Sequence, residues 1–146
     1  MPLTYLLEEL LEVQQSRITA AGLKVEVVLD RALKLYGERF LLRQALANLL
    51  DNALDFTPQE GLIRFTAKRK EAHIELCLFN QGEAIPEYAL ERLTERFYSL
   101  PRPGSGRKST GLGLNFVQEV AGLHGGALSV SNVEGGVEVR LNLPSA

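Results

Sequence analysis

The chain has 146 residues, of which 45% are hydrophobic and 23% charged, and its formal net charge is -2. These values are typical of one soluble globular domain with a core of ordinary size. The charge and the absence of a long basic cluster exclude nucleic acid as an expected partner. A single cysteine, Cys77, excludes an internal disulfide and fits a reducing compartment. No apolar run approaches the roughly 20 residues that span a bilayer, and no signal-peptide pattern opens the chain, so we expect a cytoplasmic domain.

The first part of the chain predicts two helices separated by strand segments. Leucines at helical spacing predict an amphipathic helix over residues 3–20, and the alternating "LKVEVVL" predicts a strand over 23–29. Residues 33–37, "LKLYG", are a candidate for a further short strand. A long helix is expected over 38–56, because its apolar periodicity continues until Thr57-Pro58 ends it.

Paired strands come next. Residues 62–69 and 72–80 alternate on either side of a short turn. The buried face of the second strand is expected to carry Ala72, Ile74, Leu76 and Leu78. Pro86 is then expected to open a short helix over 87–93.

The remaining chain predicts a loop, a helix and a hairpin. Residues 98–110 hold two prolines, two glycines and three basic residues, which predicts an irregular, mobile loop. A helix over 112–124 should end at two glycines, and residues 127–143 should form a hairpin that turns at 134–136. Helices and mostly antiparallel strands in mixed order predict an α+β fold, in which about three helices cover one sheet.

The long helix carries polar side chains beside its apolar face. At about 100° per residue, the positions of one polar stripe fall within roughly 80° of each other: Gln44, Asn48, Asn52 and Asp55. Asn is unfavourable inside a helix, because its side chain competes for backbone groups. With Phe56 between it and the core, the stripe predicts a pocket wall, in which a neutral Asn oxygen could bind Mg²⁺. The alternative is that both asparagines are ordinary hydrogen-bonded residues at the border of the core.

A glycine-containing segment, "STGLGLNF", has the composition of a phosphate-binding loop. Gly111 and Gly113 lie where the loop becomes a helix, so free backbone N–H groups could seat a phosphate. Arg107 and Lys108 precede them as possible charge-assisted donors. A tight turn would explain the two glycines equally well.

A third segment, "FNQGEAIP" at residues 79–86, ends a strand with side chains suited to a purine. The Asn80 amide can pair with a purine edge, Gly82 permits a tight backbone, and Ile85 can line an apolar slot. An ordinary strand-ending turn is the alternative. Each segment alone is weak evidence, whereas their order along the chain is specific.

Taken in order, the segments resemble one known family. "LLRQALANLLDNALDFTP", "FNQGEAIP", "ERFYSL" and "STGLGLNFV…GLHGG" are similar to the N, G1, F and G2 boxes of bacterial sensor histidine kinases, most like their CreC branch. These boxes belong to the catalytic and ATP-binding domain of that family. The resemblance covers almost the whole chain, from about residue 20 to 143.

The resemblance implies a Bergerat-type α/β sandwich of the GHKL superfamily, with ATP and Mg²⁺ as ligands. Asn48 would bind Mg²⁺ and Asn52 would contact phosphate. Phe56 would flank the adenine, which Asn80 would recognise. The other nucleotide contacts it implies are Gly82, Ala84, Ile85, Arg96, Tyr98, Arg107, Lys108, Ser109, Thr110, Gly111, Leu112, Gly113 and Leu114. Residues 98–110 would form a lid over the nucleotide, with Phe97 and Tyr98 at its hinge.

Gln44 fills the position where ATP-hydrolysing relatives place a glutamate base. An amide cannot take a proton from water at neutral pH. We therefore expect slow hydrolysis, so that the phosphate is kept for transfer, and we assign Asn48 and Gln44 as the expected catalytic residues.

Four residues depart from the usual family pattern. Asn80 replaces an Asp, and a neutral acceptor binds an amino group more weakly than a charged one, so weaker nucleotide binding is expected. Ala84 and Ser109 each replace a Gly. Asp55 replaces a Lys or Arg that faces the phosphates. Because a carboxylate there would repel them, we expect Asp55 to point to solvent rather than to share the Mg²⁺.

The resemblance also predicts how the domain works with others. Residues 1–20 are expected to be the end of a dimerisation helix and its linker, and 21–146 the catalytic domain. Neither His73 nor His124 lies in a phosphoacceptor motif. The acceptor histidine is therefore expected on a separate dimerisation domain of a larger inner-membrane sensor, and a response regulator would take the phosphate from it. The isolated domain is expected to be a cytoplasmic monomer without direct membrane contact.

Two other functions stay open. The four departures favour a degenerate nucleotide-binding or docking module with weak or no kinase activity. A serine kinase of the anti-sigma-factor type is also conceivable, although the F-box segment "ERFYSL" argues against it.

Overall fold

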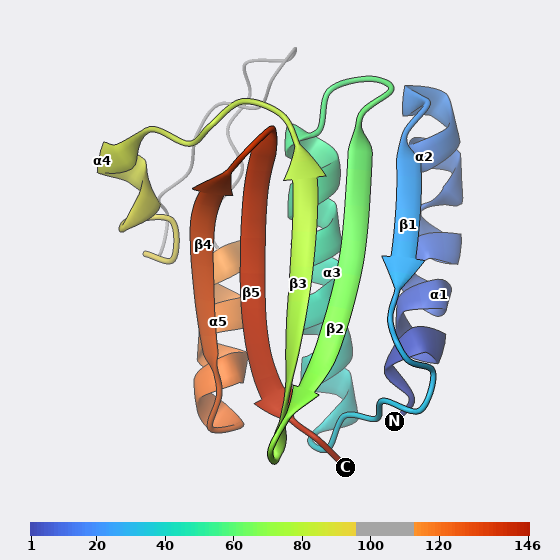
Figure 1. The fold of residues 1–146 in the computed structure, drawn as a ribbon, viewed down its shortest axis with the longest axis vertical. Helices are drawn as coiled ribbons and strands as arrows, with labels where there is room; N and C mark the ends of the chain where they lie inside the picture. The colour runs from blue at the N-terminus through green and yellow to red at the C-terminus, as the bar shows by residue number, and fades with distance from the viewer. Residues whose placement is uncertain (96–112) are drawn as a thin grey trace.

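The computed structural model of the chain describes residues 1–95 and 113–146, which form two layers (Figure 1). One layer is a five-stranded sheet in the order β1–β2–β3–β5–β4. The helices α1, α2, α3 and α5 lie together behind this sheet (Figure 1). None of the described helices covers its other face, which we call the uncovered face. The predicted α+β class and two-layer α/β sandwich are confirmed.

The sheet is mixed and mostly antiparallel, as predicted. Its strands are β1 (Lys24–Val28), β2 (Leu62–Lys70), β3 (His73–Gln81), β4 (Ala127–Val133) and β5 (Gly136–Pro144). The helices are α1 (Leu3–Val13), α2 (Gln15–Ala21), α3 (Arg39–Phe56), α4 (Glu87–Leu90) and α5 (Gly113–Leu123). Strands β1 and β2 pair in parallel, which requires a crossover, and α3 provides it. The other three strand pairs are antiparallel.

The prediction of a short strand over residues 33–37 is wrong. Leu33 and Leu35 are buried, at 9% and 2% exposure, but this stretch makes only isolated bridges within the described chain, to Pro2 and to Ser145. The alternation that predicted a strand instead reflects two leucines that anchor a connecting loop to the core.

Three smaller expectations also differ from the structure. The helix expected over residues 3–20 is broken at Gln14 (φ -97°, ψ 9°), which separates α1 from α2. The helix expected over 87–93 ends at Leu90, and turns follow it. Ala72 lies exposed in the turn between β2 and β3 and not on the buried face of β3.

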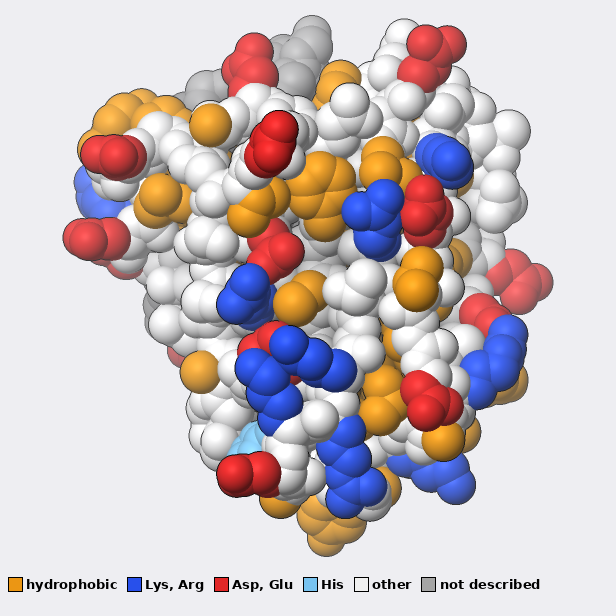
Figure 2. All heavy atoms as spheres, in the orientation of Figure 1, with side chains coloured by type: hydrophobic (Ala, Val, Ile, Leu, Met, Phe, Trp, Pro, Cys, Tyr) orange, Lys and Arg blue, Asp and Glu red, His pale blue; other side chains and the backbone are white. Residues whose placement is uncertain are grey.

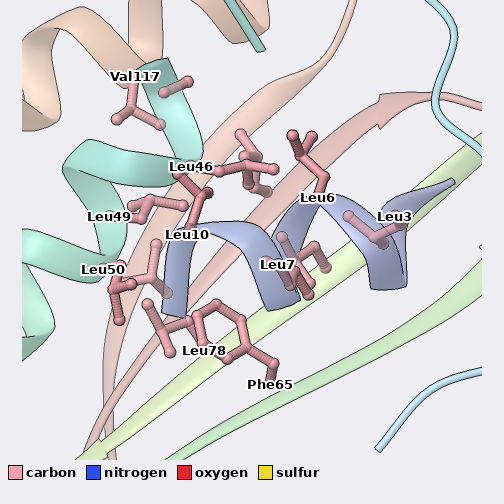
Figure 3. Packing of buried hydrophobic residues seen from close by; sticks show 14 of the residues in the cluster. Leu3, Leu6, Leu7, Leu10, Leu46, Leu49, Leu50, Phe65, Leu78 and Val117 are labelled. Carbon is pink, nitrogen blue, oxygen red and sulfur yellow. The ribbon is translucent and has the colours of Figure 1, made fainter. Parts of the chain in front are cut away.

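The core fills the space between the sheet and the helices, and α1 is part of it. Figure 3 shows the leucines of α1 directed toward α3 and toward the sheet. The residues that meet there are at most 4% exposed: Leu3, Leu6, Leu7, Leu10, Leu46, Leu49, Leu50, Phe65 and Leu78. The assignment of residues 1–20 to a dimerisation helix stays a prediction, but their apolar face is packed into this domain.

A histidine joins the C-terminal end of α5 to the N-terminal end of α3. His124 Nε2 accepts a hydrogen bond from the Glu38 backbone N–H at 3.1 Å, and its Nδ1 lies 2.8 Å from the Val120 carbonyl oxygen. The Glu38 carboxylate caps α3 by accepting from the Leu41 N–H at 2.8 Å. The sequence predicted for His124 only that it is not a phosphoacceptor. The structure shows that it also fixes the spacing of the two helices.

The uncovered face of the sheet carries charged pairs between strands (Figure 2). Glu75 on β3 lies opposite Lys68 on β2, and its carboxylate is 3.2 Å from Lys70 Nζ and 3.8 Å from Lys68 Nζ. The hydrogen bond from Lys70, followed by the charges of the neighbouring cations, lowers the pKa of Glu75. Cys77 lies on the same face, and burial raises the pKa of its thiol, as suits an unreactive strand residue.

Truncation of Leu7 tests whether α1 belongs to the folding unit. Leu7 is 1% exposed. We expect Leu7→Ala to lower the free energy of unfolding by about 2–5 kcal/mol, because a buried leucine side chain is replaced by a cavity. Tyr5, on the same helix, is 61% exposed and provides the control. Urea unfolding followed by circular dichroism measures both variants, and equal losses for Leu7→Ala and Tyr5→Ala would contradict the burial of α1.

The ion pair between Glu75 and Lys70 predicts that part of the free energy of unfolding is lost at acid pH. Because the folded pKa is lowered, the pair stabilises the domain above the unfolded carboxyl pKa of about 4.3. This contribution is lost as the pH falls through the folded value. Glu75→Gln should therefore lower the melting temperature at pH 7 and reduce the further loss below about pH 4. The exposed Glu119→Gln on α5 is the control, and an unchanged acid response in Glu75→Gln would refute the assignment.

Candidate functional site

The polar stripe predicted on α3 lies at the edge of the core. Asn48 and Asn52 are half-buried, and Gln44 is exposed. Gln44 Nε2 donates a hydrogen bond to Asn48 Oδ1 at 2.8 Å, which orients the Asn48 amide. An amide oxygen has two lone pairs, so Asn48 Oδ1 can still bind a cation while it accepts this bond.

The C-terminal end of α3 lies close to the end of β3. Thr57 ends the helix: its backbone N–H and its Oγ1 both donate to the Ala53 carbonyl oxygen, at 3.0 and 2.6 Å. Gly82, with φ +152°, lies against this end. A Cβ at position 82 would lie 3.2 Å from the Phe56 carbonyl oxygen, so the close approach and the backbone conformation both favour glycine. Phe56 itself is half-buried at the junction.

Asn80 is a buried polar side chain on the sheet opposite α3. It follows Ile74, Leu76 and Leu78 on the inner face of β3 and is 7% exposed. No hydrogen bond to its side-chain amide is present among the residues that the structure describes. In the described residues, only Thr4 Oγ1 is a fully buried side-chain polar atom without a partner, so the Asn80 amide keeps some contact with solvent and is accessible to a ligand. The backbone is tightly held, because a Cβ at Gly136 would lie 2.1 Å from the Asn80 carbonyl oxygen.

The loop after β3 is fixed by the β4–β5 hairpin. The Ile85 N–H donates to Asn132 Oδ1 at 2.7 Å, and Asn132 Nδ2 donates to the Ile85 carbonyl oxygen at 2.8 Å. The Gly82 N–H also donates to the Gly135 carbonyl oxygen at 3.2 Å. The half-buried Ile85 is thereby held beside the end of β3, whereas Ala84 is exposed. Sequence reasoning missed Asn132, because no local pattern indicates that β4 lies next to this loop.

The start of α5 supplies the third side of the site. Gly113 is its first residue, and Leu114 packs against the core. Asn115 Nδ2 donates to the Thr94 carbonyl oxygen at 2.9 Å, which ties α5 to the segment after α4. The other predicted contacts lie outside the described residues: Arg96, Tyr98, Arg107, Lys108, Ser109, Thr110, Gly111 and Leu112. The predicted hinge residue Phe97 and the rest of the proposed lid over 98–110 lie outside them as well.

Asp55 does not point to solvent, and that expectation is wrong. Its side chain is 8% exposed and forms an ion pair with Arg17 Nη2 on α2. Arg17 Nη1 also pairs with Asp51 at 2.7 Å. The burial and the paired cation explain how a carboxylate is accommodated on the stripe. Sequence reasoning missed Arg17, which precedes Asp55 by 38 positions and lies on another helix.

The donor set of the site fits a nucleotide with a divalent cation. In residues 1–95 and 113–146, no group of three His, Cys, Asp or Glu side chains could hold a metal ion. A cation at Asn48 would therefore depend on oxygens of its ligand and on water, as Mg²⁺ commonly does with phosphates. The Asn80 amide, which makes no hydrogen bond to the described residues, and the close backbone at Gly82 lie at the end of β3 where the sequence predicts the base to bind. None of the described helices has the length and hydropathy to cross a membrane.

The chain matches one protein family and several of its members. Residues 37–146 match the family described as histidine kinase-, DNA gyrase B- and HSP90-like ATPases. The sensor protein CreC of Escherichia coli K12 is 54% identical over 107 residues, which are 73% of this chain and 22% of CreC. The sensor-like histidine kinase SenX3 of Mycobacterium tuberculosis H37Rv is 32% identical over 91% of this chain and 33% of its own length. This chain thus spans between a fifth and a third of these two relatives.

Solved structures agree with this match. The catalytic domain of the histidine kinase ThkA superposes with a TM-score of 0.87 at 25% identity, covering 99% of this chain and 93% of that domain. The mycobacterial sensor histidine kinase MprB gives a TM-score of 0.81 at 30% identity, covering 99% of this chain and 95% of that structure. The family match includes α3, β3 and α5, which form the site. The chain therefore belongs to the family of histidine kinase-, DNA gyrase B- and HSP90-like ATPases.

Proposed function

We propose that this chain is the ATP-binding catalytic domain of a two-component sensor histidine kinase. It would transfer the γ-phosphate of Mg-ATP to a histidine on a separate dimerisation domain. The observation that carries the proposal is the pair of amides on the two layers: Asn48 at the edge of α3, and Asn80 on the inner face of β3, whose side chain makes no hydrogen bond to the residues that the structure describes. The named relatives support it, because they are sensor kinases and the catalytic domain of a histidine kinase.

The adenine would lie between the end of β3 and the end of α3. The Asn80 amide has both a donor and an acceptor, as does the edge of adenine, so it can pair with the base. Phe56 would flank the ring, and the half-buried Ile85 would line its apolar side. Gly82 would let the backbone approach the base, since no Cβ occupies that space.

The phosphates and Mg²⁺ would lie along the polar stripe toward the start of α5. Asn48 would hold the cation, with its amide oriented by Gln44, and Asn52 would contact a phosphate. Gly113 and the residues after it in the first turn of α5 would present their backbone N–H groups to the anion. Catalysis would come mainly from positioning and charge neutralisation, as is usual in phosphoryl transfer. Gln44 is a poor base, which favours transfer over hydrolysis.

The working assembly would need other domains. We propose that a dimerisation domain of the same protein presents the acceptor histidine and that a response regulator then takes the phosphate. A ThkA structure in complex with the response regulator TrrA supports this kind of partner. We also propose a cytoplasmic position for the domain, on the inner side of a membrane-anchored sensor.

Nucleotide titration tests the proposal directly. We expect Mg-ATP and Mg-ADP to raise the melting temperature of this chain more than AMP does. A ligand at 100 times its Kd stabilises the folded state by about 2.7 kcal/mol. Asn48→Ala should weaken the Mg-ATP response, whereas Asn142→Ala on the uncovered face of the sheet should not. In a separate assay with labelled ATP and this chain, a purified dimerisation domain that carries the acceptor histidine should gain phosphohistidine.

The outcomes separate the candidate functions. No response of the wild-type chain at millimolar nucleotide would overturn the kinase proposal and favour a docking module. A response without phosphotransfer would favour a binding module. Rapid ATP hydrolysis by the isolated chain would contradict the role of Gln44.

A charge at position 80 should change nucleotide affinity. We expect Asn80→Asp to tighten binding of Mg-ATP, because a charge-assisted bond to the adenine amino group is roughly twice as strong as a neutral one. The ligand-free variant should be less stable, since the carboxylate is buried beside apolar strands. Calorimetric titration and thermal unfolding measure the two effects. Asn80→Ala is the control and should weaken binding, and unchanged affinity in both variants would exclude Asn80 from the adenine site.

A further inference from the structure

The ion pair between Arg17 and Asp55 places a buried carboxylate on the polar stripe. Asp55 follows Asn52 by three residues, and side chains three apart are neighbours on a helix surface. It also lies two helical turns from Asn48, at nearly the same angle around α3. An uncompensated carboxylate at this position would repel the phosphates of a nucleotide bound along the stripe.

Arg17 compensates two carboxylates at once. Its Nη2 pairs with Asp55, and its Nη1 pairs with Asp51 at 2.7 Å. Asp51 and Asp55 are four residues apart on α3, where like charges destabilise a helix. The Asp55 side chain is 8% exposed and that of Arg17 is 38% exposed, so solvent and salt screen this pair less than a fully exposed one. The planar fork of a guanidinium can satisfy both partners, which a lysine could not do in the same way.

We propose that Arg17 is an electrostatic positioning residue of the nucleotide site. It holds Asp55 against α2 and neutralises it, so that phosphates near Asn48 and Asn52 meet a paired carboxylate. This inference rests on the proposed function and extends it to α2, which contributes no predicted contact. Arg17 acts through Asp55, and its effect should therefore depend on the charge of the ligand.

Arg17→Met tests the inference, with Arg43→Met as the matched control. Arg43 also ties an N-terminal helix to α3, pairs with Glu9 at 3.0 Å and is similarly exposed at 36%, but it lies on a different side of α3. Calorimetric titration measures the Kd of Mg-ATP, Mg-ADP, AMP and adenosine for each variant. We expect Arg17→Met to weaken Mg-ATP binding by roughly tenfold, with a smaller loss for each phosphate removed and little change for adenosine. The Arg43→Met variant should show no dependence on phosphate number.

Charge removal at Asp55 provides the second arm. Asp55→Asn in the Arg17→Met background should restore most of the Mg-ATP affinity, because the uncovered charge is gone. Asp55→Asn alone should tighten the binding of Mg-ATP, because Asp55 then no longer neutralises the positive charge of Arg17. This single variant tests the inference even where Arg17→Met fails to fold, and weaker Mg-ATP binding by it would overturn the proposal.

The results distinguish the two proposals. Equal losses for all four ligands in Arg17→Met would show a purely structural role and overturn the inference. So would an unchanged Mg-ATP affinity in Arg17→Met, or failure of Asp55→Asn to restore it. In each of these cases the wild-type chain still binds nucleotide, and the proposed function stands. A wild-type chain that binds none of the four ligands overturns both proposals.

Discussion

The burial of one face of α3 against the sheet determines where every other part of the site lies. Leu42, Leu46 and Leu49 are at most 1% exposed and fix the rotation of the helix about its axis. One residue corresponds to about 100° of rotation, so a shift of one position would move Asn48 either into the core or out to solvent. The apolar contacts therefore set the direction of the polar stripe, although no residue of the stripe contributes to the core.

The two ends of α3 are held by different means. At its N-terminal end, Glu38 caps the helix, and its backbone N–H donates to His124, which directly follows α5. At its C-terminal end, Thr57 stops the helix and Gly82 brings β3 close to it. The first junction sets the distance between α3 and α5, and the second sets the distance between α3 and the sheet. A ligand between these three elements would meet surfaces whose spacing is already fixed, which reduces the entropy that binding must offset.

The spacing of apolar residues predicted the structural features that depend on local sequence. The stripe on α3, the pairing of β2 with β3 and the final hairpin all follow from apolar spacing and from Pro and Gly positions, and the structure contains them. The partners that join distant segments could not be predicted in this way. The helical stretch is interrupted at Gln14, and Arg17 on the second helix then pairs with Asp55. No Gly or Pro in the sequence indicates this interruption. Leu33 and Leu35 predicted a strand because a loop that anchors leucines in the core shows the same alternation as a short strand.

The neutral residue at position 80 is consistent with its surroundings. Its neighbours across the sheet are Ile63 and Val137, at 0% and 6% exposure, so a charge there would be removed from water. A buried carboxylate without a cationic partner loses far more hydration free energy than an amide does. The Asn80 amide therefore lowers the cost of the ligand-free fold, while a carboxylate would bind the adenine amino group more strongly. If position 80 contacts the adenine as proposed, its side chain would balance ligand-free stability against nucleotide affinity, and the neutral Asn would favour stability.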